Sequence, residues 1–193
     1  AMFRNTIPSV TVSFDENRNQ YYKEMFRVKQ FLLSLVIRLY TFSQSLQYND
    51  FVLLHGVTSA WALCQILPYL KKVDDVNRAV LEFMCVLIAV FVIQREQSMT
   101  KGIEEAARWK SLEDVDEDEA SYWKRMMAES SLKLKDEALD GVFHDEHVYK
   151  LVVVVLDCLE DGVVDEKLAY LAIRKVTKHP LTITGRTNTK QDK

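Results

Sequence analysis

The 193-residue sequence has few of the residues that make tight turns, with only 5 Gly and 3 Pro. A β-sandwich or barrel needs such residues at short intervals, so their scarcity argues against both folds. Long helices need few turns. With 48% apolar and 27% charged residues, the chain has the composition of a globular protein and is long enough to bury one core. We therefore expect an all-α fold, a multi-helix bundle of about six helices.

Cysteine is also scarce, with Cys64, Cys85 and Cys158 widely spaced along the chain. No CxxC pair is present, so the sequence gives no support for a cysteine-based zinc site. Each cysteine sits in an apolar stretch with helical character. We expect three buried, reduced thiols, as is usual in a cytoplasmic protein.

Concentrated positive charge and long apolar runs are missing as well. The net charge is -3 and no Lys/Arg cluster occurs, so nucleic-acid binding is not expected.

The N-terminus, AMFR, lacks the apolar core of a signal peptide and is typical of a chain cut from a longer one. The run 80–93 contains Glu82 and is shorter than the roughly 20 residues that cross a bilayer. We expect a core helix there and no membrane contact.

Apolar spacing of three and four residues and capping residues predict the helices. Asn49 or Asp50, the pair at 74–75, Asp145 and Asp165 are the expected N-caps. The expected helices cover 19–43, 51–67, 76–97, 120–134, 146–161 and 166–178. The run at 151–156 is β-branched, but its apolar continuation and caps favour helix over strand. Residues 1–18 are expected to be irregular, 19–179 to form the helical domain and 180–193 to be a disordered tail.

Finer features of these elements can also be predicted. Phe26, Leu33, Ile37 and Tyr40 fall on one face of the first helix, which is expected to be buried. The acid-rich segment 101–118 is predicted to be a solvated loop with one helical turn at 103–109. Gly162 is the expected stop of the helix before it.

The chain contains no Gly-rich phosphate loop, no GxSxG and no HExxH, which removes the enzyme classes built on them. Its chemistry therefore centres on histidine. His55, directly before Gly56, is either a core histidine bonded to a carbonyl or a ligand where the backbone is open to close approach. His144 and His147 are three apart, a spacing that allows shared metal binding but also surface or capping roles. His179 precedes Pro180 at a helix end and is given no function.

Two stretches together resemble a known family. Residues 50–60 read DFVLLHGVTSA, with Leu-Pro at 67–68. Residues 122–124 read YWK, and 143–150 read FHDEHVYK. Their order and spacing resemble the C-terminal half of the questin oxidase-like family over about 21–178.

The resemblance implies an oxidoreductase that uses oxygen on a small aromatic substrate, as a Baeyer–Villiger-type monooxygenase or a ring-cleaving oxygenase. It also implies a non-haem iron held mainly by histidines, with NADPH as the reductant. His55 and His147 are the metal ligands it suggests, and Lys150 is the catalytic candidate, which would have to be deprotonated or carbamylated to reach a metal. Two histidines make an incomplete site, so the remaining ligands are expected from a missing N-terminal half, without which the chain would be inactive.

The competing hypotheses are a non-catalytic all-α interaction module and a degenerate paralogue that has lost the chemistry. The oxygenase hypothesis predicts that His55 and His147 point into one buried pocket. The interaction hypothesis predicts histidines bonded to backbone carbonyls and a large exposed apolar groove.

Overall fold

The computed structural model describes residues 18–43, 49–93, 99–108, 146–179 and 181–182. Within these ranges the all-α prediction is confirmed. The α-helices are α1 Arg18–Phe42, α2 Phe51–Ile66, α3 Val73–Ile93, α4 Met99–Arg108, α7 Glu146–Glu160 and α8 Glu166–Lys178. A 3-10 turn, η1 Leu67–Tyr69, follows α2. The predicted helix 120–134, the Asp145 cap and His144 lie outside the described residues.

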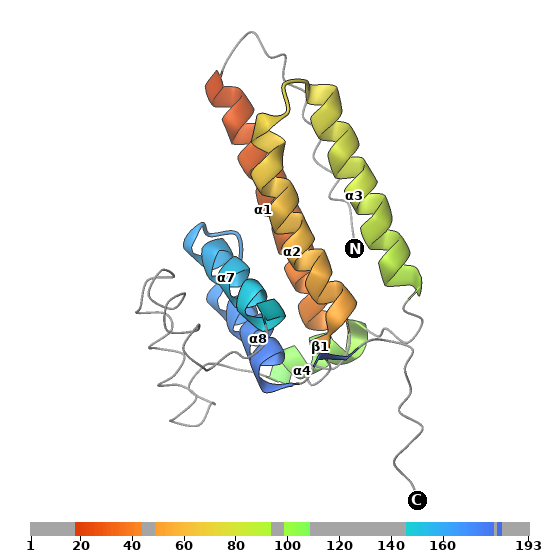
Figure 1. The fold of residues 1–193 in the computed structure, drawn as a ribbon. Helices are drawn as coiled ribbons and strands as arrows, with labels where there is room; N and C mark the ends of the chain where they lie inside the picture. Colours follow the sequence, from red (N-terminus) through yellow and green to blue (C-terminus); the bar gives the residue numbers. More distant parts are fainter. Residues whose placement is uncertain (1–17, 44–48, 94–98, 109–145, 180, 183–193) are drawn as a thin grey trace, which may run out of the picture.

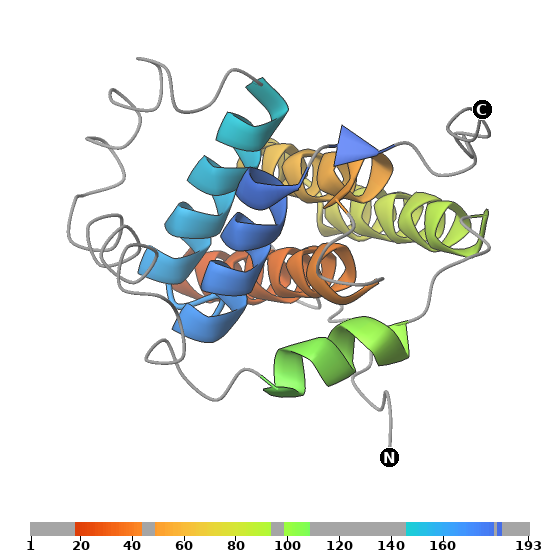
Figure 2. The same cartoon turned by 90° about the horizontal axis from the view of Figure 1, so that it is seen from below.

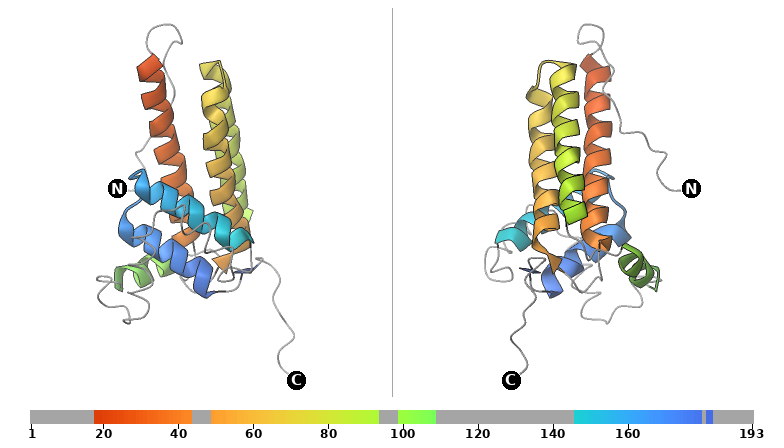
Figure 3. Two further views of the ribbon diagram at one scale, coloured as in Figure 1. Left: turned by 60° about the vertical axis from the view of Figure 1, so that its left-hand side comes forward. Right: turned by 90° about the vertical axis from the view of Figure 1, so that its right-hand side faces the viewer.

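The helices form two groups (Figure 1). The long helices α1, α2 and α3 run alongside one another, and the shorter pair α7 and α8 lies across the lower half of α1 and α2. Figure 3 shows this crossing from two further sides. Viewed from below, α4 lies beside the lower end of α1 (Figure 2). The core therefore lies where α1 and α2 meet α7 and α8.

The helix α1 is buried on more than one side because α2, α4 and α8 all pack against it. Leu33, Ile37 and Tyr40 are fully buried, as the spacing predicts. Phe26 is not, since its side chain is 44% exposed. The prediction was wrong for Phe26 because the buried face at the start of α1 follows Tyr21, Met25 and Val28, and Phe26 lies beside that face.

The helix α2 is the central element, with α1, α3 and α7 around it. It begins after Asp50 and ends as expected at η1, where Pro68 cannot continue the helix. The stretch Phe51–Tyr69 has the length and the apolar composition of a helix that could cross a membrane. Core helices of soluble proteins have the same two properties.

The helix α3 differs from the prediction in two ways. It begins at Val73, so Asp74 and Asp75 lie in its first turn, where acidic groups favourably oppose the helix dipole. Only one face is buried. The other carries exposed Leu81, Cys85, Val86, Ile88 and Val92. The expected core helix at 80–93 is therefore buried on one face only. The expectation that Cys85 is buried was wrong. Both results arise because, among the described helices, only α2 packs extensively against α3.

The helix α4 occupies a segment predicted to be mostly loop. It spans Met99–Arg108, where the acid content suggested a single turn. It packs against α1, and Gly102 is buried. Tertiary packing of one face is what stabilises most short helices, and charge density along a sequence does not report that packing.

The predicted turn between α7 and α8 and the predicted Asp165 cap are confirmed. The α7 segment 151–156 is helical, and all of its residues except Val153 are buried because α8 packs on one side and α2 on the other. Gly162 has φ 66°. The backbone N–H of Val163 donates to Cys158 O at 2.8 Å, which closes the end of α7. Asp165 then caps α8 by accepting from Leu168 N at 2.7 Å.

We expect Gly162→Ala to lower the free energy of unfolding by about 1 kcal/mol, because an L side chain is strained in the left-handed region. Space is not limiting, since nothing lies within 4 Å of an added Cβ. Urea unfolding would measure the loss. Gly162→Asn should lose less, because asparagine tolerates this conformation, and equal losses for the two variants would contradict the backbone explanation.

The folded part extends beyond the boundary predicted at residue 180. Residues Leu181–Thr182 form the strand β2, which pairs in parallel with β1, Asn49–Asp50. Asn49 is opposite Leu181, and Asp50 is opposite Thr182. The pair ties the end of α8 to the start of α2.

Candidate functional site

The start of α2 is fixed by a buried carboxylate. Asp50 accepts hydrogen bonds from Val52 N and Leu53 N, each at 2.9 Å, and is itself fully buried. These bonds satisfy two of the N–H groups that a helix start leaves open. Phe51 is therefore held as the first residue of the helix. His55 is four positions later, on the same face.

The second histidine reaches this point from the start of another helix. His147 is the second residue of α7, which packs against α2. The centroids of the His55 and His147 rings lie 5.0 Å apart, and their planes differ by 27°. The structure thus brings together two of the sequence-predicted site residues that are far apart in the chain.

Phe51 completes a cluster of three rings. Its centroid lies 4.3 Å from that of His55 and 5.1 Å from that of His147. All three side chains are half-buried. Aromatic pairs at these separations attract one another through both burial and ring electrostatics. The cluster therefore joins α2 to α7 at their N-terminal ends.

The His55 side chain has an unsatisfied polar atom. Its Nδ1 is buried and has no hydrogen-bond partner among the described residues. A buried polar atom in this state costs free energy, so such an atom calls for an explanation. The observation does not fit the interpretation of His55 as a core histidine bonded to a carbonyl through this nitrogen. In the tautomer protonated at Nε2, Nδ1 would offer its lone pair to a ligand.

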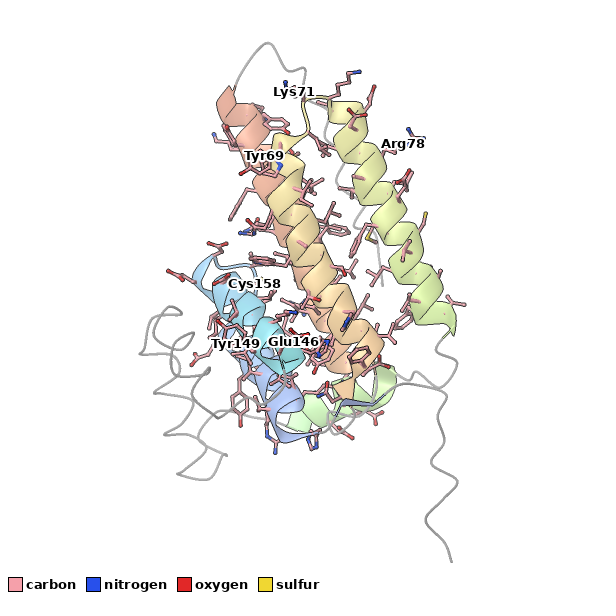
Figure 4. The ribbon with its side chains drawn as sticks, viewed as in Figure 1. Tyr69, Lys71, Arg78, Glu146, Tyr149 and Cys158 are labelled. Atoms are coloured by element: carbon pink, nitrogen blue, oxygen red, sulfur yellow. The ribbon has the colours of Figure 1, made fainter. Side chains whose placement is uncertain are left out.

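Glu146 lies beside His147 and links it to Lys150. One carboxylate oxygen is 3.9 Å from His147 Nε2, and the other accepts from Lys150 Nζ at 3.2 Å. The Glu146 and Lys150 side chains are exposed. Lys150 therefore projects toward Glu146, and its ion pair within the described residues is with that carboxylate and not with either imidazole ring. Figure 4 shows Glu146 and Tyr149 on α7, far from Tyr69 and Arg78 at the other end of the long helices.

The glycine beside His55 serves helix packing. A Cβ added at Gly56 would lie 3.4 Å from Leu87 Cδ1 of α3. The close approach that the His-Gly pair suggested is therefore made by a side chain of the neighbouring helix.

The donor set suits a metal ion in part. Neutral imidazoles are good ligands for iron and zinc, and two of them converge here beside a buried nitrogen without a partner. The described residues contain no group of three or more His, Cys, Asp or Glu side chains placed to hold a metal. His55 and His147 would fit as two ligands of an ion, which would need further ligands beyond the described residues.

A second polar cluster lies beneath the start of α2. Lys175 of α8 is buried and donates to Tyr40 O at 2.8 Å and Thr41 O at 3.1 Å, two carbonyls at the end of α1. Burial lowers the pKa of Lys175 to about 8, while Asp50 acts in the opposite direction. Tyr40 Oη donates to Asn49 Oδ1 at 2.7 Å. This network supports the strand and cap that position Phe51 and His55.

The two buried cysteines, Cys64 and Cys158, are poor candidates for chemistry. Burial raises the pKa of Cys64 to about 11 and that of Cys158 to about 12. Both thiols therefore stay protonated at neutral pH, and neither is an activated nucleophile. The pKa of His179 is lowered, first by burial and then by Arg174 and Lys175.

Sequence reasoning missed Phe51 and Glu146. The signal for Phe51 is its spacing of four residues from His55 on a helix whose cap was predicted. The contact with His147 has no local signal, since it depends on the packing of α7 on α2. Glu146 directly precedes His147, but adjacent residues on a helix do not face each other.

Comparison with known proteins gives one match. The family model described as Questin oxidase-like matches residues 5–155. No curated protein and no solved structure matches this chain. The family match contains both imidazole-bearing helix starts. The chain therefore belongs to the questin oxidase-like family.

Proposed function

We propose that the chain carries part of the active site of an oxygen-dependent oxidoreductase, in which His55 and His147 hold a non-haem iron. Family membership supports oxidase-type chemistry. The observation that carries the metal proposal is the pair of rings 5.0 Å apart with the buried, unpartnered Nδ1 of His55.

Iron bound at this pair would supply redox chemistry toward oxygen and a charged centre that orients an aromatic enolate or phenolate. The chain's own residues have the supporting roles. Phe51 shields one side of the imidazoles from water, and Glu146 adds a negative charge 3.9 Å from His147 Nε2. Lys150, held by Glu146, is the proposed catalytic cation, whose position on α7 is set by that ion pair.

Two oxygenase types remain distinct predictions of this proposal. A Baeyer–Villiger-type monooxygenase inserts one oxygen atom into the substrate and reduces the other to water, so it consumes one NADPH per turnover. A ring-cleaving dioxygenase places both atoms in the product and needs no net reductant. Labelled oxygen and NADPH consumption would separate the two.

The test is iron content. The chain would be loaded with ferrous iron without oxygen, desalted and measured by elemental analysis. We expect bound iron in the unmodified chain, and loss of most of it in His55→Ala and His147→Ala, because each removes a direct ligand. Ser59→Ala is the matched control, an exposed position one turn from His55. Iron content that is absent from the unmodified chain, or unchanged in both histidine variants, would contradict the proposal.

The second candidate function is a non-catalytic interaction module, which is supported by an apolar groove on the protein. A groove of about 630 Å³ lies between α1 and α3. Apolar side chains dominate its lining, among them Phe31, Leu35, Met84, Leu87 and Phe91. A groove of this kind suits an apolar partner. Oxygen uptake that depends on added iron would count against this candidate.

A further inference from the structure

We propose that Phe51 is the positioning residue of the imidazole pair. This inference rests on the proposed function, but its central claim concerns the protein without metal. Phe51 is the described side chain whose ring contacts both His55 and His147. It sets the spacing and tilt at which the two imidazoles face each other.

The position of Phe51 is itself over-determined. It directly follows Asp50, whose carboxylate caps α2 and whose backbone pairs with β2. The side chain is therefore anchored at a helix start that cannot shift without breaking buried hydrogen bonds. A ring held in this way gives His55 and His147 a fixed surface to pack against.

Packing against Phe51 restrains the planes of both imidazoles. Within the described residues, His55 Nδ1 makes no hydrogen bond that would fix its ring. The carboxylate of Glu146 lies 3.9 Å from His147 Nε2, beyond hydrogen-bonding distance. Groups that orient metal-bound histidines change metal affinity by about 10- to 100-fold when removed.

The experiment compares Phe51→Leu with Phe51→Tyr. Leucine retains an apolar side chain but removes the flat ring, whereas tyrosine retains the ring. Phe31→Leu is the matched control, a partly buried phenylalanine on α1 that lines the groove between α1 and α3. Melting temperatures would be recorded for each variant to verify folding.

Two quantities would be measured on the full 193-residue chain. The first is the nuclear Overhauser effect between the ring protons of His55 and His147 in metal-free protein, which reports the distance between the two rings. The second is the dissociation constant for ferrous iron. We expect Phe51→Leu to weaken the Overhauser effect between His55 and His147 and to weaken iron binding at least tenfold. Phe51→Tyr and Phe31→Leu should remain close to the unmodified chain in both measurements.

The two readouts separate failure of this inference from failure of the proposed function. If the unmodified chain binds no iron, the proposed function fails, and the Overhauser effect between the two histidine rings still decides the role of Phe51. If Phe51→Leu is folded and leaves that effect unchanged, the positioning role is wrong. The role is also wrong if Phe51→Tyr perturbs the rings as much as leucine does.

Discussion

Asp50→Ala is expected to lower the free energy of unfolding by about 2 kcal/mol at pH 7 and by clearly less at pH 9.5. Loss of an N-cap accounts for about 1 kcal/mol. The rest arises because the buried ammonium of Lys175 loses the carboxylate that stabilises it, and an uncompensated buried charge is costly. Asp50 and Lys175 are both fully buried or nearly so.

The pH dependence follows from the pKa of Lys175, which folding lowers from 10.5 to about 8. Because the folded state then holds this proton less tightly than the unfolded state, stability rises with pH between these two values. Removing Asp50 lowers the pKa of Lys175 further. At pH 9.5 Lys175 is mostly neutral in both proteins, so only the cap contribution separates them.

Asp165→Ala provides the control for this prediction. Asp165 also caps a helix, accepting from Leu168 N, but it is exposed. We expect it to lose about 1 kcal/mol at both pH values. Urea unfolding at pH 7 and pH 9.5 would measure the loss of stability of each variant, relative to the unmodified chain, at both pH values. If Asp50→Ala shows the same loss at both pH values, the proposed coupling to Lys175 does not exist.

Leu54→Ala is expected to lower the free energy of unfolding by about 3 to 5 kcal/mol, because it opens a cavity in a packed core. Leu54 has no exposed surface and lies on α2, between His55 and the buried Leu53 in sequence. Calorimetry or urea unfolding would measure the loss. Ile66→Ala on the same helix removes a side chain that is 55% exposed and should lose much less. Equal losses would mean that α2 is not the centre of the core.

Local signals were enough to predict several elements. Asp165, Gly162 and the residues between them fix the α7–α8 turn through caps and backbone conformation that depend on neighbours in sequence. The run 151–156 is β-branched, but the apolar residues and caps that flank it make the whole segment too long for a typical strand, and this predicts a helix. The same reasoning failed for α4 and Cys85. Both depend on which faces other helices cover, and no local pattern encodes that coverage.

The helical fold and the ends of most helices can be predicted from the sequence, because turn scarcity, capping residues and apolar spacing act over a few neighbouring positions. The family resemblance lies in short strings of residues and is visible there as well. The stacking of the His55 and His147 rings, and the contact of Phe51 with both, become visible only in the folded chain. Their separation depends on how α7 packs across α2, which is the sum of many apolar contacts made by residues distant in the chain.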